Sequence, residues 1–90
     1  MSLSQNKRLG VVAIIIQDRQ QAVKKINDIL TDHSDVIIGR LGLPQPQKNL
    51  SIISLIVDGS TDDVGALTGK IGQLDNVTVK TAFAKTSSIQ

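Results

Sequence analysis

The sequence predicts an α+β fold of the ferredoxin-like type, in which a four-stranded antiparallel sheet carries two helices on one face, in the order β-α-β-β-α-β. Three observations predict it. Two runs are apolar on both faces, two segments repeat apolar residues every three or four positions, and turn residues separate the segments. The expected strands cover residues 8–17, 35–43, 50–57 and 77–85, and the expected helices cover about 19–32 and 61–73.

The first and third strands are expected at the centre of the sheet, where this topology places them. The composition agrees, because residues 11–16 and 50–57 offer apolar side chains to both faces. The second strand, which ends before Pro44, and the fourth strand carry glycines, threonines and charged residues. These two strands are therefore expected at the edges.

Each helix has a candidate cap at its start. Asp18 is suited to cap the first helix, and Ser60 or Thr61 can cap the second. Asp62 and Asp63 follow at the positive end of the second helix dipole, where acidic residues are favourable. Both helices therefore have well-marked N-termini.

Three glycines recur on a second face of the later helix, away from its apolar stripe. Gly65, Gly69 and Gly72 each cost a helix about 1 kcal/mol relative to alanine. Close approach of a backbone, a partner or a ligand would offset this cost. The alternatives are a locally irregular helix or a glycine cap near residue 72.

We expect one domain at residues 8–85, with flexible ends at 1–7 and 86–90. Ten basic residues against eight aspartates give a net charge of +2, too small and too scattered to predict binding to nucleic acid or an anionic membrane. No apolar run approaches the roughly 20 residues of a membrane span. With no recognisable signal peptide, the sequence predicts a cytoplasmic protein.

The composition also narrows the chemistry. The chain has no cysteine, one histidine and one aromatic residue. This excludes disulfides, thiolate metal sites and stacking platforms for RNA bases, and it predicts no metal, no cofactor and no catalytic residues. His33 continues the apolar stripe of the first helix, so we expect a structural, half-buried imidazole there. Residues 65–71 are not a phosphate-binding loop, because three residues instead of four separate Gly65 and Gly69, and Ile71 instead of Ser or Thr follows Lys70.

The aliphatic content predicts an assembly. The chain has 29 Ile, Leu and Val residues, more than one sheet face and two helices can bury. An exposed apolar sheet face of several hundred Å² is rare in monomers. We therefore expect a homo-oligomer, most simply a two-fold dimer, with a monomer as the alternative.

Four segments, residues 14–22, 40–44, 65–74 and 79–81, resemble a small stand-alone family, the iron-only hydrogenase system regulators. The resemblance covers about residues 8–84. It implies an ACT-like domain related to the C-terminal domain of the nickel-responsive repressor, an oligomer, and a regulatory role. Only about seven residues precede the first strand, so direct DNA binding is not expected.

ACT-like domains generally bind small effectors at subunit interfaces, so the resemblance implies a non-enzymatic, ligand-sensing regulator. The alternative is a protein–protein docking module without a small ligand. The candidate effector-binding residues are Asp18, Arg19, Arg40, Gly42 and Gly65, and the candidate partner-packing residues are Gly65, Gly69 and Gly72.

Overall fold

A computed structural model describes residues 7–17 and 19–85 of the chain. The elements are β1 (Arg8–Gln17), α1 (Arg19–Asp32), β2 (Ile37–Gln45), β3 (Leu50–Gly59), α2 (Thr61–Gly72) and β4 (Val77–Phe83), with short 3-10 helices η2 (Ser34–Val36) and η3 (Pro46–Lys48). The predicted cap Asp18 and the ends predicted to be flexible, apart from Lys7, lie outside the described residues. The α+β βαββαβ fold is confirmed.

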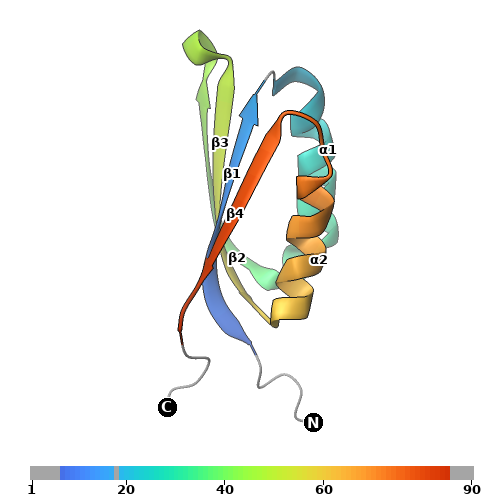
Figure 1. Ribbon diagram of the computed structural model, residues 1–90, viewed down its shortest axis with the longest axis vertical. Coiled ribbons are helices and arrows are strands. Elements are labelled where there is room, and N and C mark those ends of the chain that lie inside the picture. Colours follow the sequence, from blue (N-terminus) through green and yellow to red (C-terminus); the bar gives the residue numbers. More distant parts are fainter. Residues whose placement is uncertain (1–6, 18, 86–90) are drawn as a thin grey trace.

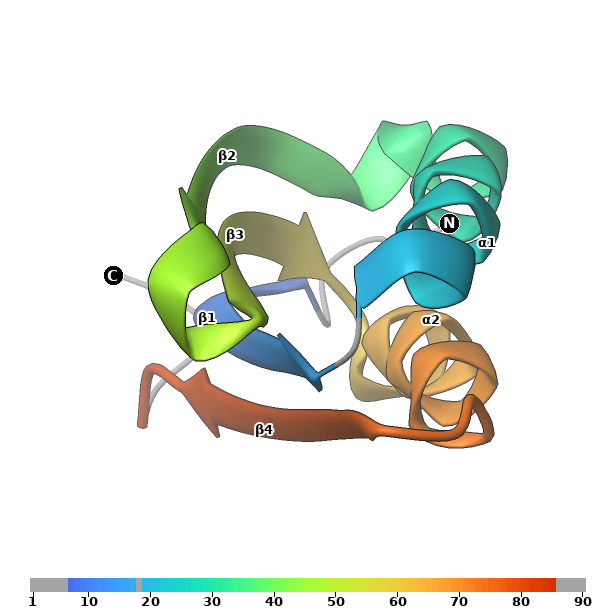
Figure 2. The same ribbon diagram turned by 90° about the horizontal axis from the view of Figure 1, so that it is seen from above.

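The sheet has the order β2-β3-β1-β4, with all neighbours antiparallel, so the prediction of β1 and β3 as central strands is confirmed. Both helices cover the same face of the sheet (Figure 1). Seen from above, α1 lies on the β2 side and α2 on the β4 side (Figure 2). Within the described part of the chain, neither helix is long and apolar enough to cross a membrane.

The core lies between the helices and the inner face of the sheet. Successive side chains of a strand point to opposite faces, so every second residue of β1 and β3 is buried. The buried apolar side chains are Val12, Ile14 and Ile16 of β1, Ile53, Leu55 and Val57 of β3, Ala22, Ile26 and Leu30 of α1, Val64, Leu67 and Ile71 of α2, and Val36 of η2.

The second strand begins later and ends later than predicted. Residues 34–36 form η2 instead of the start of a strand, because Val36 turns inward and packs against Gly59. A Cβ atom added to Gly59 would lie 3.0 Å from Val36 Cγ1. The strand continues through Pro44, which was expected to end it. An edge strand has one side without sheet partners, so it tolerates a residue that lacks an N–H group.

The third strand also extends beyond its predicted end. Asp58 and Gly59 were expected to form a turn, but they pair with Leu9 and Arg8 of β1. The cause is the length of β1, whose first two residues offer partners that local patterning cannot reveal. β4, in contrast, ends at Phe83, two residues before its predicted end.

The start of α2 is as predicted. Ser60 is the N-cap, and its hydroxyl oxygen accepts a hydrogen bond from the Asp63 backbone N–H at 3.0 Å. The helix is α-helical to Gly72 and is followed by Gln73 in a right-handed conformation. No described glycine has a positive φ, so the alternative of a glycine cap near residue 72 is wrong.

Gly10 lies in the buried row of β1, where the backbone and a side chain of β4 occupy the space that a Cβ atom would need. It pairs with Phe83, the only aromatic residue of the chain. A Cβ atom at position 10 would lie 2.9 Å from the Ala82 carbonyl oxygen and 3.1 Å from Phe83 Cδ1. An aromatic ring packed over a strand glycine is a favourable pairing that any larger residue would disrupt.

We therefore predict that Gly10→Ala lowers the free energy of unfolding by about 1–3 kcal/mol through overpacking. Gly42→Ala is the matched control, because no atom lies within 4 Å of the added methyl group. This control is expected to change stability by less than about 1 kcal/mol. Urea denaturation of both variants measures the difference, and equal effects would contradict the packing described for Gly10.

Candidate functional site

The sheet face opposite the helices, here called the outer face, is strongly apolar. The pairing register aligns its side chains in rows that cross the strands: Leu43, Ile52 and Ile15 form one row, Leu41, Ser54 and Ala13 the next, and Gly39, Ile56 and Val11 the third. Leu9 extends β1 beyond these rows, and Ile38 lies beside Gly39 at a register shift in β2. Eight of these residues are large, exposed apolar side chains.

The polar residues of the outer face lie at its margins. On β4, Thr78 pairs with Ile15 and Lys80 with Ala13, so this strand adds hydroxyl and ammonium groups to the ends of two rows. Asp58 lies opposite Leu9 at one end of β3. The apolar part of the outer face therefore spans β2, β3 and β1 and is centred on β3.

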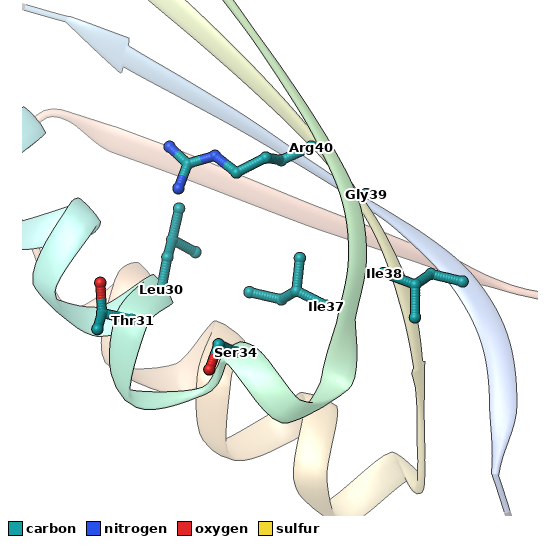
Figure 3. A pocket seen from close by; sticks show the side chains of 7 residues that line it. All are labelled: Leu30, Thr31, Ser34, Ile37, Ile38, Gly39 and Arg40. Carbon is teal, nitrogen blue, oxygen red and sulfur yellow. The ribbon is translucent and has the colours of Figure 1, made fainter.

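A second feature lies at the edge of the sheet, between the C-terminal half of α1 and β2 (Figure 3). It is an open hollow of about 370 Å³, within the range of roughly 300–1,000 Å³ typical of small-molecule sites. We call it the Arg40 hollow. Its lining residues are Leu30, Thr31, Ser34, Ile37, Ile38, Gly39 and Arg40.

Asn27 of α1 organises the polar side of the Arg40 hollow. The Arg40 Nη2 group donates a hydrogen bond to Asn27 Oδ1 at 3.0 Å, and the Thr31 hydroxyl donates one to the Asn27 carbonyl oxygen at 2.9 Å. Among the residues with described side chains, no carboxylate lies within ion-pairing distance of Arg40, and the ion pair that is found joins Lys24 and Asp28. The guanidinium is thus positioned by a neutral partner and keeps donors for a further acceptor.

The opposite side of the Arg40 hollow is apolar. Leu30 and Ile37 point toward the space beneath the Arg40 side chain, and Ser34 lies near them (Figure 3). Ile38, the next residue along β2, points to the other side of the strand. The arrangement can hold a small molecule with an anionic group for Arg40 and an aliphatic part for Leu30 and Ile37.

The structure brings only part of the predicted effector set together. Arg40 lines the hollow, whereas Gly42 and Gly65 do not. Gly65 lies on α2, the helix on the far side of α1 from β2 (Figure 2). Asp18 and the side chain of Arg19 lie outside the described part of the structure.

Sequence reasoning missed the α1 side of the hollow. Asn27, Leu30 and Thr31 of α1 and Ser34, the first residue of η2, follow the spacing i, i+3, i+4, i+7 that is typical of one helix face. This face mixes an amide, a leucine and two hydroxyls, so it does not stand out from an ordinary half-exposed helix surface. The spacing was a usable signal, but only together with knowledge that β2 runs beside this face.

The glycine face of α2 is open. No atom outside the helix lies within 4 Å of a Cβ atom added at Gly65 or Gly69, and at Gly72 the nearest is Val79 Cγ1 at 3.9 Å. Close approach within the chain therefore does not account for the first two glycines. Packing of a partner on Gly65, Gly69 and Gly72 stays a prediction.

His33 is half-buried, as expected, and follows the last residue of α1. Its Nε2 atom is buried, and no described group forms a hydrogen bond with it. In the described ranges, no cluster of three or more His, Cys, Asp or Glu side chains could hold a metal ion.

Solved structures of low sequence identity share the fold of this chain. A PII-like nitrogen regulatory protein from Thiomonas intermedia, CPII, aligns with 86% of this chain and 90% of its own at a TM-score of 0.55 and 14% identity. A formyltetrahydrofolate deformylase from Burkholderia mallei aligns with 84% of this chain and 28% of its own at a TM-score of 0.61 and 12% identity. At such identities the likeness shows the shared ferredoxin-like fold.

The family follows from a closer match. The chain belongs to the TM1266-like family, whose description is "Iron-only hydrogenase system regulator, putative", and the match covers residues 8–81. The structure of the uncharacterized protein TM1266 from Thermotoga maritima is 38% identical and covers 88% of this chain and 99% of its own, with a TM-score of 0.84. The resemblance seen in the sequence is thereby confirmed. No curated protein matches the chain.

The open space around Gly65 and Gly69 predicts that alanine at either position stabilises the protein. Gly69→Ala is expected to raise the free energy of unfolding by about 1 kcal/mol, because alanine is the better helix former and its methyl group meets nothing. Gly65→Ala should act in the same direction. Thermal and urea denaturation measure both effects. A loss of stability in either variant would show that the glycine face packs closely against something.

Proposed function

We propose that this protein is a non-enzymatic regulatory oligomer that senses a small ligand in the Arg40 hollow and acts in an iron-only hydrogenase system. The family description supports the regulatory role. The observation that carries the sensing role is the position of the Arg40 guanidinium. Its Nη2 atom donates a hydrogen bond to Asn27 Oδ1 at 3.0 Å, beside the aliphatic lining of the hollow. No described carboxylate forms an ion pair with it.

The lining of the hollow defines the class of ligand. Arg40 favours a planar anion such as a carboxylate, to which a guanidinium can donate two parallel hydrogen bonds. Leu30 and Ile37 favour an aliphatic body. A small monocarboxylate with a short hydrocarbon chain meets both requirements.

β2 gives ligand binding a route to the rest of the assembly. Ile37 to Arg40 line the hollow, and this segment contains the register shift of β2 between Ile37 and Gly39. Ile38 is 61% exposed on the other side of the strand, next to Gly39, which pairs with Ile56 of the outer face. A ligand that favours one arrangement of this segment also favours one arrangement of the outer face, which is what a sensor requires.

A docking module without a small ligand is the second candidate. It is favoured by the glycine face of α2, where Gly65 and Gly69 leave the helix backbone open to a partner. In this reading the energetic cost of the glycines is offset in the complex with a protein of the hydrogenase system.

Thermal denaturation in the presence of short-chain monocarboxylates separates the two candidates. A ligand that binds only the folded protein stabilises it by RT ln(1 + [L]/Kd), about 2.7 kcal/mol at 100-fold excess over Kd. We expect a rise in Tm for the natural protein, a loss of that rise in Arg40→Gln, and no loss in Lys70→Gln, which removes an exposed charge from α2. The neutral amides of the same acids should have no effect.

An unchanged Tm with every acid, or an equal response in Arg40→Gln, would contradict sensing in the Arg40 hollow. The docking candidate instead predicts no rise in Tm with any of these acids and an effect of changes at Gly69. Gly69→Leu should then abolish co-purification with a protein of the hydrogenase system, while Gly69→Ala, which adds one methyl group, should weaken it less.

A further inference from the structure

The outer face is too large and too apolar to be an ordinary surface. Its eight large apolar side chains are between 37% and 69% exposed. Together they present on the order of 700 Å² of apolar surface, whereas the largest such patch on a typical monomer is about 300–600 Å². The exposed apolar area of the outer face is close to the roughly 800 Å² that each partner buries in a standard protein–protein interface.

We infer that a second copy of this chain covers the outer face, sheet against sheet, around a two-fold axis. This interface is the oligomer contact of the proposed function, but it requires no ligand, and its test uses none. Failure of this inference and failure of ligand sensing are therefore separate results.

A second copy of the chain matches the outer face better than the short segments outside the two described ranges. Residues 1–6 and 86–90 contain three large apolar residues, Met1, Leu3 and Ile89. Three such side chains cannot match eight. A second copy brings an apolar face of equal area.

The charge distribution makes the outer face compatible with itself. The three central rows on β2, β3 and β1 contain no charged residue, so two copies meet there without like-charge repulsion. Lys80 lies on β4, at the end of the middle row, and Asp58 lies at one end of β3. Both can stay in water at the rim of an interface centred on β3.

The same rows indicate the direction of the axis. An axis parallel to the strands and above β3 places β2 of one copy over β1 of the other and leaves β4 uncovered. An axis across the strands through the middle row would instead place the two Lys80 ammonium groups over one another. Both axes keep the strands of the two sheets aligned to within about 30°, as in β-sandwiches, so the position of Lys80 decides between them.

The parallel axis pairs a large residue with a small one. Leu41, 69% exposed on β2, comes to lie over Ala13 on β1 of the second copy, and symmetry repeats the contact. Leu41 and Ala13 occupy the same row, on either side of Ser54. The large side chain thus enters the shallow part of the face that Ala13 and Ser54 leave between larger neighbours.

Sedimentation equilibrium tests the interface. The natural protein should sediment as a dimer, or as an assembly of dimers, at about 10 µM, and Leu41→Lys should weaken this association at least about tenfold. Ala82→Lys is the matched control, because it places the same charge on the outer row of β4, which the parallel axis leaves uncovered. Circular dichroism confirms that both variants fold. A monomeric natural protein, or an equal effect of the two variants, overturns the inference.

A size exchange tests the Leu41–Ala13 contact. Ala13→Leu alone should weaken the dimer by collision with Leu41 of the second copy, and the double variant Ala13→Leu, Leu41→Ala should recover most of the lost affinity. Both positions are exposed in the single chain, so neither change disturbs its core. If the fold-loss of dimer affinity in the double variant equals the product of the fold-losses in the two single variants, the proposed pairing is overturned.

Discussion

The ten-residue antiparallel pairing of β1 with β3 organises the whole molecule. It runs without interruption from Arg8 opposite Gly59 to Gln17 opposite Leu50. Because neighbouring residues of a strand point to opposite faces, this single register decides which side chains meet the helices and which meet the outer face. A slip of one residue in either strand would carry its buried isoleucines and leucines to the other side of the sheet.

Both strands of that pair are apolar on both faces, and this has two consequences. The inner rows supply the core on which α1 and α2 pack, with Ile14, Ile16 and Leu55 fully enclosed. The outer rows create a second hydrophobic surface that the chain cannot cover with its own helices (Figure 2). The stability of the fold and its tendency to associate thus have the same physical origin, the burial of aliphatic surface.

The edge position of β2 allows irregularities that a central strand would not accept. Its register shift, its proline at position 44 and the open space at Gly42 all lie where no further strand is paired. This freedom opens the hollow between β2 and α1 and places Arg40 against Asn27. The least regular strand of the sheet therefore contacts both proposed binding surfaces.

Local pattern was sufficient for the elements, their order in the sheet and the two faces of β1 and β3. Periodicity, capping at Ser60 and the distribution of charged residues act over a few neighbouring positions, and those positions can be read from the chain alone. The inward turn of Val36 onto Gly59 and the pairing of Asp58 with Leu9 required the folded molecule, because each joins segments more than twenty residues apart. The same holds for the Arg40 hollow, since Asn27 and Arg40 belong to different elements, and only the packing of α1 beside β2 brings their side chains within hydrogen-bonding distance.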